Sequence, residues 1–594
     1  MNLHLPQFTL KPEEIEQSPN TLRAAKRWQS ELPLVNMGET TRLFYLAIRT
    51  LNRQPLPARL RLDLQEQLYP TAQIVLQHLN KHLKILTHPL SGKVKQISRL
   101  AEALMLEMAV GYKHVVYAVV SHQEKLDNRS VAIAVHRAMR FLEMALAHNA
   151  ATYKSGSKST WHDLHRLEGF AEQYHLADIE VKDNLYATIS ASTPRDVYKQ
   201  ACLLAITQPL KLRTGEVARL QAYFEKACHL CNMKKSLSPD ENGMVHVASL
   251  KSSEPPAYIP LADITTFSNL RGFDLSRLIS TLNDMLEDNT TETHSYQTPG
   301  KGDVRLDTSL IKRLTATWTT QEKRRYSRVL TNRSIVAAVG IKNIIQAINA
   351  DINPELSREE LFFTEPELNG QDIDDPTHFV GEMSAETEQF DHPFADDSMI
   401  YHTDLVGVES DINNPIARKA LPASWRDWRV VNTGAGGYGL VWDKDEASGV
   451  QVGEAISLRE KEYNIHHWRT GVVRWLHNSE EHGLQVGLQL LAPRAIVVSV
   501  ETIRNRSYSQ IMPMDALMLP GMKTLQHPPS LLVPTGIFRS GDILDIAMLG
   551  KKLHIELRDI GESPSFFTQF FYKSSEVKSI ASKKEEFEDL WNRL

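Results

Sequence analysis

Apolar side chains recur at helical spacing through the first 235 residues of the chain. Leu43, Leu46, Ala47 and Leu51 form one such stripe, and residues 131–146 continue the same period. This spacing places apolar groups on one face of a helix. The pattern therefore predicts an all-α domain over residues 1–235.

The pattern changes after this helical stretch. Pro, Gly and Ser become more frequent, and Val245 and Val247 alternate with polar neighbours as in short strands;. Helical spacing returns over residues 275–286 and 310–318. Residues 236–318 are therefore expected to form a small α+β domain or a linker region.

Strand-like segments dominate from Arg324 onward. The apolar run 334–341 suits a buried strand, and glycine-punctuated runs of strand length follow at residues 450–458, 470–476 and 484–490. Short apolar runs with glycines between them are typical of a small antiparallel β-barrel. We expect this barrel over residues 319–505.

A long acidic stretch interrupts the expected barrel. Between Asp351 and Asp411 the sequence has 18 acidic residues and one basic residue, Arg358. Such a segment repels itself and buries little apolar surface. It predicts an insertion at about residues 345–425 that forms a mobile loop or arm.

The last part of the chain alternates apolar and polar residues again. Leu553, Ile555 and Leu557 interleave with charged or polar neighbours, and residues 587–594 place apolar groups on one helical face;. Residues 506–594 are therefore expected to form a second small β-domain with a C-terminal helix. The predicted fold class is multidomain α + β.

Composition narrows the functional classes. The 594-residue chain has a formal net charge of -5, which argues against a general DNA- or RNA-binding protein, and its three cysteines exclude a disulfide-rich scaffold;. Its start shows no apolar export signal. The most apolar stretch, residues 100–120, is broken by Glu102, Glu107 and Lys113, so no membrane span and a cytoplasmic location are expected;.

Two short segments have the chemistry of an anionic nucleotide site. Arg324, Arg325 and Arg328 lie in a linker just before a strand, and Asn432 opens a glycine-rich segment at a strand end. Guanidinium groups bind phosphate bidentately and match the O6/N7 edge of guanine. An Asn carbonyl can accept a hydrogen bond from guanine, and glycines let a base approach the backbone.

These residues resemble the PilZ domain, the bacterial receptor for cyclic di-GMP. That family has an RxxxR motif in a linker and a (D/N)xSxxG motif on the barrel. Arg324 and Arg328 match the first motif, and Asn432 and Gly437 match the ends of the second. The resemblance implies that the arginines hold the phosphates and guanine of the ligand, while the Asp or Asn contacts guanine.

The match departs from the family pattern in two ways. Gly434 stands where the family has Ser, which removes a hydrogen bond that contributes about 0.5–1.5 kcal/mol;. The acidic insertion also separates the two motifs, but the entropy of loop closure grows slowly with length. A weakened ligand site is therefore expected.

The predicted ligand-binding set has seven members. They are Arg324, Arg325, Arg328, Asn432, Gly434, Gly437 and Trp475. Trp475 could stack on guanine, but packing in the barrel core is the preferred role for this side chain. No cofactor other than the ligand cyclic di-GMP is expected.

These observations predict a non-enzymatic effector that binds cyclic di-GMP and moves a helical region that contacts an unidentified protein partner. The alternative is a degenerate PilZ scaffold that binds proteins instead of nucleotide, for example in pilus, flagellar or surface-polysaccharide regulation. No catalytic sequence motif is present. Cys228 and Cys231 form a CxxC pair that could bind zinc with His162, His165 or His175, but ordinary helix packing is the expected role, and no metal site is predicted;.

Overall fold

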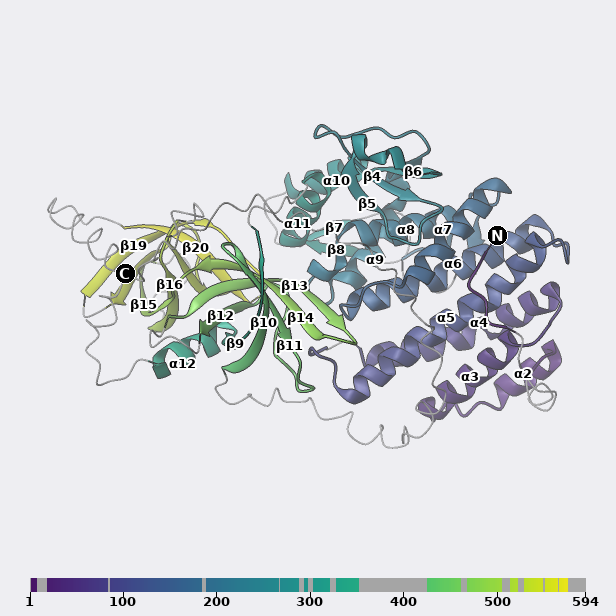
Figure 1. Ribbon diagram of the computed structural model, residues 1–594, viewed down its shortest axis with the longest axis horizontal. Coiled ribbons are helices and arrows are strands. Elements are labelled where there is room, and N and C mark those ends of the chain that lie inside the picture. The colour runs from purple at the N-terminus through teal and green to yellow at the C-terminus, as the bar shows by residue number, and fades with distance from the viewer. Residues whose placement is uncertain are drawn as a thin grey trace.

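The computed structural model describes most of the chain, with gaps. The described residues are 2–7, 19–83, 86–183, 188–266, 268–287, 293–296, 303–320, 327–351, 425–460, 467–504, 513–521, 528–548, 551–564 and 566–574. Arg324, Arg325, the acidic insertion after Asp351 and the predicted C-terminal helix lie outside these ranges. Figure 1 shows a helical half at one end and two β-barrels at the other.

The helical half contains long helices that pack around one core. The helices are α2 (Leu22–Ser30), α3 (Met37–Asn52), α4 (Ala58–Lys81), α5 (Gly92–Val120), α6 (Asn128–Ala151), α7 (Lys158–Gln173), α8 (Pro194–Ile206) and α9 (Glu216–Ala227), with short helices η1 (Pro209–Lys211) and η2 (Cys228–Leu230) and a small pair of strands β1 (Val181–Lys182) and β2 (Ala191–Ser192). Local sequence sets their starts. Thr193 and Asp196 form a capping box at α8, and Pro194 occupies its first turn;.

Helix α5 is the central helix of this half. By length and composition it is apolar enough to cross a membrane, but 61% of its most apolar window is buried inside the protein. The neighbouring helices α4 and α6 pack on it, and Leu104, Met108 and Val115 are fully buried. The apolar residues of α5 therefore pack in the core of the helical half.

The α+β region that follows shares the core of the helical half. Strands β3 (Asn232–Lys234), β4 (Met244–Ser249), β5 (Ala257–Pro260) and β6 (Leu270–Asp274) form a sheet in the order β3-β6-β4-β5; η3 (Leu261–Thr266), α10 (Ser276–Glu287), β7 (Thr293–Tyr296), β8 (Val304–Asp307) and α11 (Thr308–Thr319) complete the region. Phe273, Leu310 and Trp318 belong to the same apolar cluster as the long helices. Helix α11 is thereby fixed to the helical half.

The first barrel is closed and antiparallel. Strands β9 (Val329–Val339), β10 (Arg426–Gly434), β11 (Gly437–Trp442), β12 (Ala455–Glu460), β13 (Arg469–Ser479) and β14 (Gly483–Ala492) close in the order β10-β11-β14-β13-β12-β9. Alternate residues such as Leu440, Val486 and Leu488 fill the interior. Their neighbours along each strand therefore face outward.

Two local features of this barrel differ from the expectation. The run 450–458 is not one strand, because Gly453 adopts φ 88° and β12 begins only at Ala455. Residues after β9 form helix α12 (Ile341–Asp351) rather than the start of the acidic arm. Asp351 ends that helix, and both of its carboxylate oxygens lie 2.7 Å from Arg459 Nη1.

The second barrel is also closed. It contains β15 (Ile496–Arg504), β16 (Met514–Leu519), β17 (Ser530–Pro534), β18 (Ile543–Met548), β19 (Lys551–Ile560) and β20 (Phe567–Ser574), in the order β15-β16-β17-β20-β19-β18. The sequence assigned β15 to the range 319–505, whereas its partners β16 and β18 belong to the second barrel. The predicted multidomain α + β class, with a helical half and two β-domains, is confirmed.

Buried contacts join the three parts. Helix α12 lies against both barrels (Figure 1), with Ile344 in an apolar cluster that also holds Leu517 and Phe567. Tyr153 at the end of α6 belongs to the core cluster of the first barrel, and its backbone carbonyl accepts a hydrogen bond from the Asn478 amide at 2.7 Å. The first barrel is therefore docked on both of its neighbours.

Candidate functional site

One row of residues crosses five neighbouring strands of the first barrel. In the strand register, Leu330 of β9 pairs with Asn432 of β10, Asn432 with Gly439 of β11, Gly439 with Gly487 of β14, and Gly487 with Trp475 of β13. Gly439 and Gly487 lie between residues of the interior, so they face outward;. Since strands lie about 4.8 Å apart, the row runs roughly 19 Å along the curved outer surface and passes around much of this closed six-stranded barrel;.

Glycines occupy the middle of this surface. We call Gly434, Gly437, Gly439 and Gly487 the glycine ledge. A β-carbon on Gly437 would lie 2.1 Å from the Leu488 carbonyl oxygen, so only glycine fits this strand crossing. The ledge carries no side chains of its own, so neighbouring groups approach its backbone closely, and Gly439 and Gly487 are buried beneath them;.

Asn432 borders the ledge on the β10 side. A β-carbon on Gly439 would lie 2.6 Å from Asn432 Nδ2, so the amide of Asn432 lies over this glycine. Its Oδ1 atom is buried, and it accepts no hydrogen bond from any residue that the structure describes. An acceptor in this position can bind a donor supplied by a ligand.

Trp475 borders the ledge on the opposite side. Its indole lies over Gly487, where a β-carbon would come within 1.9 Å of the ring nitrogen. The side chain is only partly buried and does not belong to the barrel core cluster. A register shift between Val473 and Trp475 accounts for its outward direction, because an extra residue in a strand reverses the alternation of faces;.

The linker before β9 runs along the third edge of the ledge. A β-carbon on Gly434 would lie 2.6 Å from the Ser327 carbonyl oxygen and 3.8 Å from the Arg328 Cγ. The backbone of the linker thus occupies the space that a serine side chain would need. In this conformation a serine at position 434 would clash with the linker backbone, which accounts for the glycine in this motif.

Arg328 is the described arginine of the predicted set. Its side chain is exposed, and within the described part of the chain it makes no ion pair. Arg333, five residues further along β9, differs because its guanidinium lies 3.2 Å from Glu460. Among the described residues, Arg328 therefore supplies a positive charge without an ion-pair partner at the edge of the ledge. Arg324 and Arg325 belong to the undescribed linker.

The fourth edge of the ledge connects to the second barrel. Gln489 pairs with Gly437 in the register, and its Oε1 accepts a hydrogen bond from Arg474 Nε at 2.8 Å. Arg474 also donates to Glu562 at 3.1 Å. Burial raises the pKa of Glu562, but the hydrogen bond and charge of Arg474 outweigh this effect and lower it. A charged bridge thus links the ledge to the neighbouring barrel.

Some members of this surface are absent from the predicted set. Gly439, Gly487, Gln489 and Leu330 were not selected from the sequence. A glycine inside a strand, as in the run 484–490, is a local indication of close backbone approach;. The roles of Leu330 and Gln489 depend on register, which single residues do not reveal.

The Cys228 and Cys231 pair does not gather with the histidines considered as zinc ligands. Both thiols are buried, and burial raises their pKa values to about 12. Both ring nitrogens of His165 have other partners, the Tyr198 hydroxyl at 2.7 Å and the Glu254 carbonyl oxygen at 2.9 Å. The cysteines therefore pack as apolar core residues, which is the role expected for them.

Comparison with known proteins agrees with the division of the chain into a helical half and two barrels. Three family models match consecutive segments: the N-terminal domain of the cyclic-di-GMP receptor FimW at residues 23–239, its middle PilZ domain at 245–496 and its C-terminal β-barrel domain at 498–575. These matches define a multidomain protein with a central PilZ barrel.

A relative of known name matches over nearly the whole length. The cyclic-di-GMP receptor FimW of Pseudomonas aeruginosa is 24% identical over 597 residues, which cover 97% of this chain and 96% of the relative. No solved structure matches. With the three consecutive domain matches, the chain belongs to the PilZ-domain cyclic di-GMP receptor family.

Proposed function

We propose that the chain is an effector that binds cyclic di-GMP on the glycine ledge of its first barrel. The observation that carries this proposal is the register of Asn432, Gly439, Gly487 and Trp475 in one outward-facing row, with the exposed Arg328 at the edge. This surface combines a cation, an unpaired acceptor and a platform of glycines. A dinucleotide with two phosphodiesters and two guanines requires all three.

Each residue has a chemical role in this proposal. Arg324, Arg325 and Arg328 hold phosphates and guanine edges, because guanidinium groups bind both bidentately. Asn432 Oδ1 accepts a hydrogen bond from guanine. Trp475 stacks on a base above the ledge of Gly434 and Gly437.

The same geometry suggests how binding could move the domains. Helix α11 is fixed to the helical half, where the His246 side chain bonds the Trp318 carbonyl oxygen at 3.0 Å. The linker resumes at Ser327, which lies on Gly434. Capture of the arginines by a ligand reorders this linker, so the pull on α11 reorients the helical half relative to the barrel. The protein partner contacted by the helical half is unidentified.

Calorimetric titration of the purified full chain with cyclic di-GMP tests the proposal. Arg328→Ala is expected to weaken binding by about ten- to a hundredfold, because a hydrogen bond to a charged group contributes about 1.5–3 kcal/mol. Arg333→Ala is the matched control, since it removes the same charge five residues further along the chain, where the arginine pairs with Glu460. It should bind nearly as the parent does.

Two results would contradict the proposal. The first is the absence of heat at any ligand concentration, with a folded protein by circular dichroism. The second is equal weakening by both variants, which would indicate a general effect of charge instead of a site at the ledge.

One observation favours the alternative of a scaffold that binds proteins. The Ser327 carbonyl lies where the family's serine side chain would stand, so the linker partly covers the ledge. A ledge closed by its own linker would serve protein contacts. In that case the chain binds no cyclic di-GMP, and Gly434→Ser, which displaces the linker, does not create binding either.

In this proposal the protein binds cyclic di-GMP and does not convert it chemically. The family named by the matches is a receptor family. We place the effector in the cytoplasm, a reducing compartment in which the free Cys202, Cys228 and Cys231 persist as thiols;. No cofactor besides the ligand is part of this function.

A further inference from the structure

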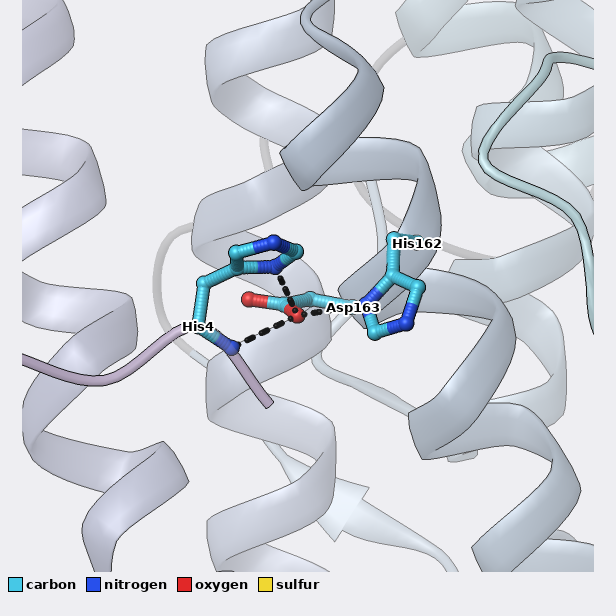
Figure 2. Close-up of side chains that lie close together, drawn as sticks. All are labelled: His4, His162 and Asp163. Atoms are coloured by element: carbon cyan, nitrogen blue, oxygen red, sulfur yellow. Dashed lines mark hydrogen bonds and ion pairs between the residues drawn. The ribbon is translucent and has the colours of Figure 1, made fainter. Parts of the chain in front are cut away.

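A cluster of two imidazoles and a carboxylate lies in the helical half, far from the ledge in the chain. His4 belongs to the described segment 2–7, and His162 and Asp163 are neighbours on α7. Figure 2 shows both rings turned toward the carboxylate. The Nδ1 atoms of His4 and His162 lie 2.9 Å and 3.2 Å from the same oxygen, Asp163 Oδ1.

Backbone contacts hold His4 in this position. Its amide donates to Asp163 Oδ1 at 3.1 Å, and its carbonyl oxygen accepts a hydrogen bond from Lys113 Nζ at 2.7 Å. The neighbouring Leu3 is 7% exposed and packs into the main core. The ring of His4 is therefore presented by an ordered backbone instead of a free chain end.

The three side-chain atoms have the spacing of ligands around a metal ion. With metal–ligand bonds of about 2.0–2.1 Å, the atoms of a tetrahedral zinc site lie roughly 3.3 Å apart. The two imidazole-to-carboxylate distances are close to this value, and all the ligand atoms lie within 4.8 Å of one another, so the two imidazoles must move closer together to share one ion. We propose that His4, His162 and Asp163 bind a zinc ion that ties the N-terminal segment to α7.

The surroundings of Asp163 suit a ligating carboxylate. The residue is 1% exposed, and its other oxygen, Oδ2, bonds Lys113 Nζ at 2.6 Å. Lys113 thereby orients the carboxylate, as outer partners of metal ligands commonly do, and an ion at Oδ1 would replace the contacts that this oxygen makes with the two imidazoles;. Burial alone would raise the pKa of Asp163, but hydrogen bonds from His162 and His4 and the charge of Lys113 lower it below its usual range.

Two features set the strength and shape of the site. The cations Lys113 and Arg166 both face the cluster. Arg166 Nε donates a hydrogen bond to His162 Nε2 at 3.4 Å. When Nδ1 binds metal, the ring proton lies on Nε2, so this guanidinium must turn away. The site should therefore bind zinc more weakly than a closed four-ligand site. The side chain of His4 is 44% exposed, which leaves the fourth position to water;.

Competition with a chromophoric zinc chelator measures binding to the purified full chain. His4→Ala and His162→Ala are each expected to lower the zinc affinity at least tenfold. Two controls should leave it unchanged: His482→Ala removes an exposed histidine, and Cys228→Ala tests the buried thiols. Cobalt in place of zinc should show the visible absorption of a tetrahedral site in the parent and lose it in His162→Ala.

Thermal melts separate metal binding from a purely structural cluster. Zinc should raise the melting temperature of the parent and leave that of His4→Ala unchanged, because a ligand stabilises only the state that binds it. His4 lies outside the helices, so this variant should stay folded. The proposal is wrong if the parent binds no zinc, or if His4→Ala and His162→Ala lower the melting temperature without changing zinc affinity.

Discussion

A single β-carbon decides which residues can occupy the centre of the ledge. At Gly487 it would meet the Trp475 indole at 1.9 Å, and at Gly439 the Asn432 amide at 2.6 Å. Both contacts are with side chains that border the proposed ligand surface. Substitution of either glycine should therefore displace a site residue and leave the barrel closed.

Gly487→Ala is expected to push the indole of Trp475 off the ledge. Cyclic di-GMP affinity should fall by about tenfold or more, since stacking of a base on an aromatic ring contributes about 1–3 kcal/mol. Calorimetry and tryptophan fluorescence measure the two effects. Gly169→Ala is the control, because its β-carbon would meet Leu250 at an ordinary 3.7 Å. Unchanged binding by Gly487→Ala would remove Trp475 from the site.

Among the elements, α12 and α7 each contribute buried side chains that stabilise the packing of their neighbours. Helix α12 fills the junction of the two barrels with Ile344 and Ile348, and its last residue, Asp351, binds Arg459 and the Trp468 indole nitrogen. Helix α7 carries the His162–Asp163 pair and also buries Glu168. The buried carboxyl group of Glu168 makes the stability of the helical half depend on pH.

Glu168 on α7 should make the helical half less stable as pH rises. Burial raises its pKa to about 8, although Arg195 Nη1 of α8 lies 3.1 Å from one oxygen and opposes the shift. The folded state thus holds a proton that the unfolded state releases at its ordinary value of 4.5. The contribution of the protonated Glu168 to the free energy of unfolding is fully present below about pH 4.5 and is lost as pH rises toward 8.

Glu168→Gln should remove the decrease in unfolding free energy that ionisation of Glu168 causes as pH rises. Between pH 5 and 8 the difference in unfolding free energy between variant and parent should grow by up to about 1.4 kcal/mol per pH unit. Denaturant titrations at several pH values measure it. Glu241→Gln, an exposed change of the same kind, should follow the parent. Parallel pH profiles for Glu168→Gln and the parent would contradict the assignment.

At the scale of the whole molecule, both buried and exposed contacts join the helical half to the first barrel, and the buried ones include hydrogen bonds from the Ser448 amide and hydroxyl to the His88 carbonyl oxygen. Tyr153 packs against the core residues of the barrel, and its hydroxyl donates to the Leu212 carbonyl oxygen at 2.9 Å. Arg99 and Glu480 also pair across this boundary at 2.9 Å, but both side chains are more than half exposed. Exposed pairs contribute little, so the buried tyrosine should dominate the docking.

Tyr153→Ala is therefore expected to undock the barrel from the helical half. The lost ring should cost about 3–5 kcal/mol, similar to other large-to-small changes in a core. Calorimetry should then resolve separate unfolding transitions, and small-angle scattering should show a larger radius of gyration. Glu480→Gln should change stability by under about 1 kcal/mol. A single unshifted transition in Tyr153→Ala would show that other contacts hold the domains.

Most elements followed from local patterns, and the exceptions have identifiable causes. Strands β13 and β14 coincide with the runs found at residues 470–476 and 484–490, whereas β12 begins late because Gly453 turns the chain. Asp351 was counted with the acidic arm, yet Arg459 and Trp468 fix it at the end of a helix. Those partners lie more than a hundred residues away, so local composition could not indicate them.

The sequence by itself determined the class of most described segments, and it contained the two motifs, because helical and strand periods and glycine-rich turns are properties of neighbouring residues. It determined neither the ledge nor the zinc cluster. The ledge exists because barrel closure places β9, β10, β11, β14 and β13 side by side, and register shifts at Asn432 and Trp475 turn both side chains outward. His4 reaches Asp163 only because the helical core brings the two segments together. Such contacts depend on register and packing between distant segments, which only the tertiary structure decides.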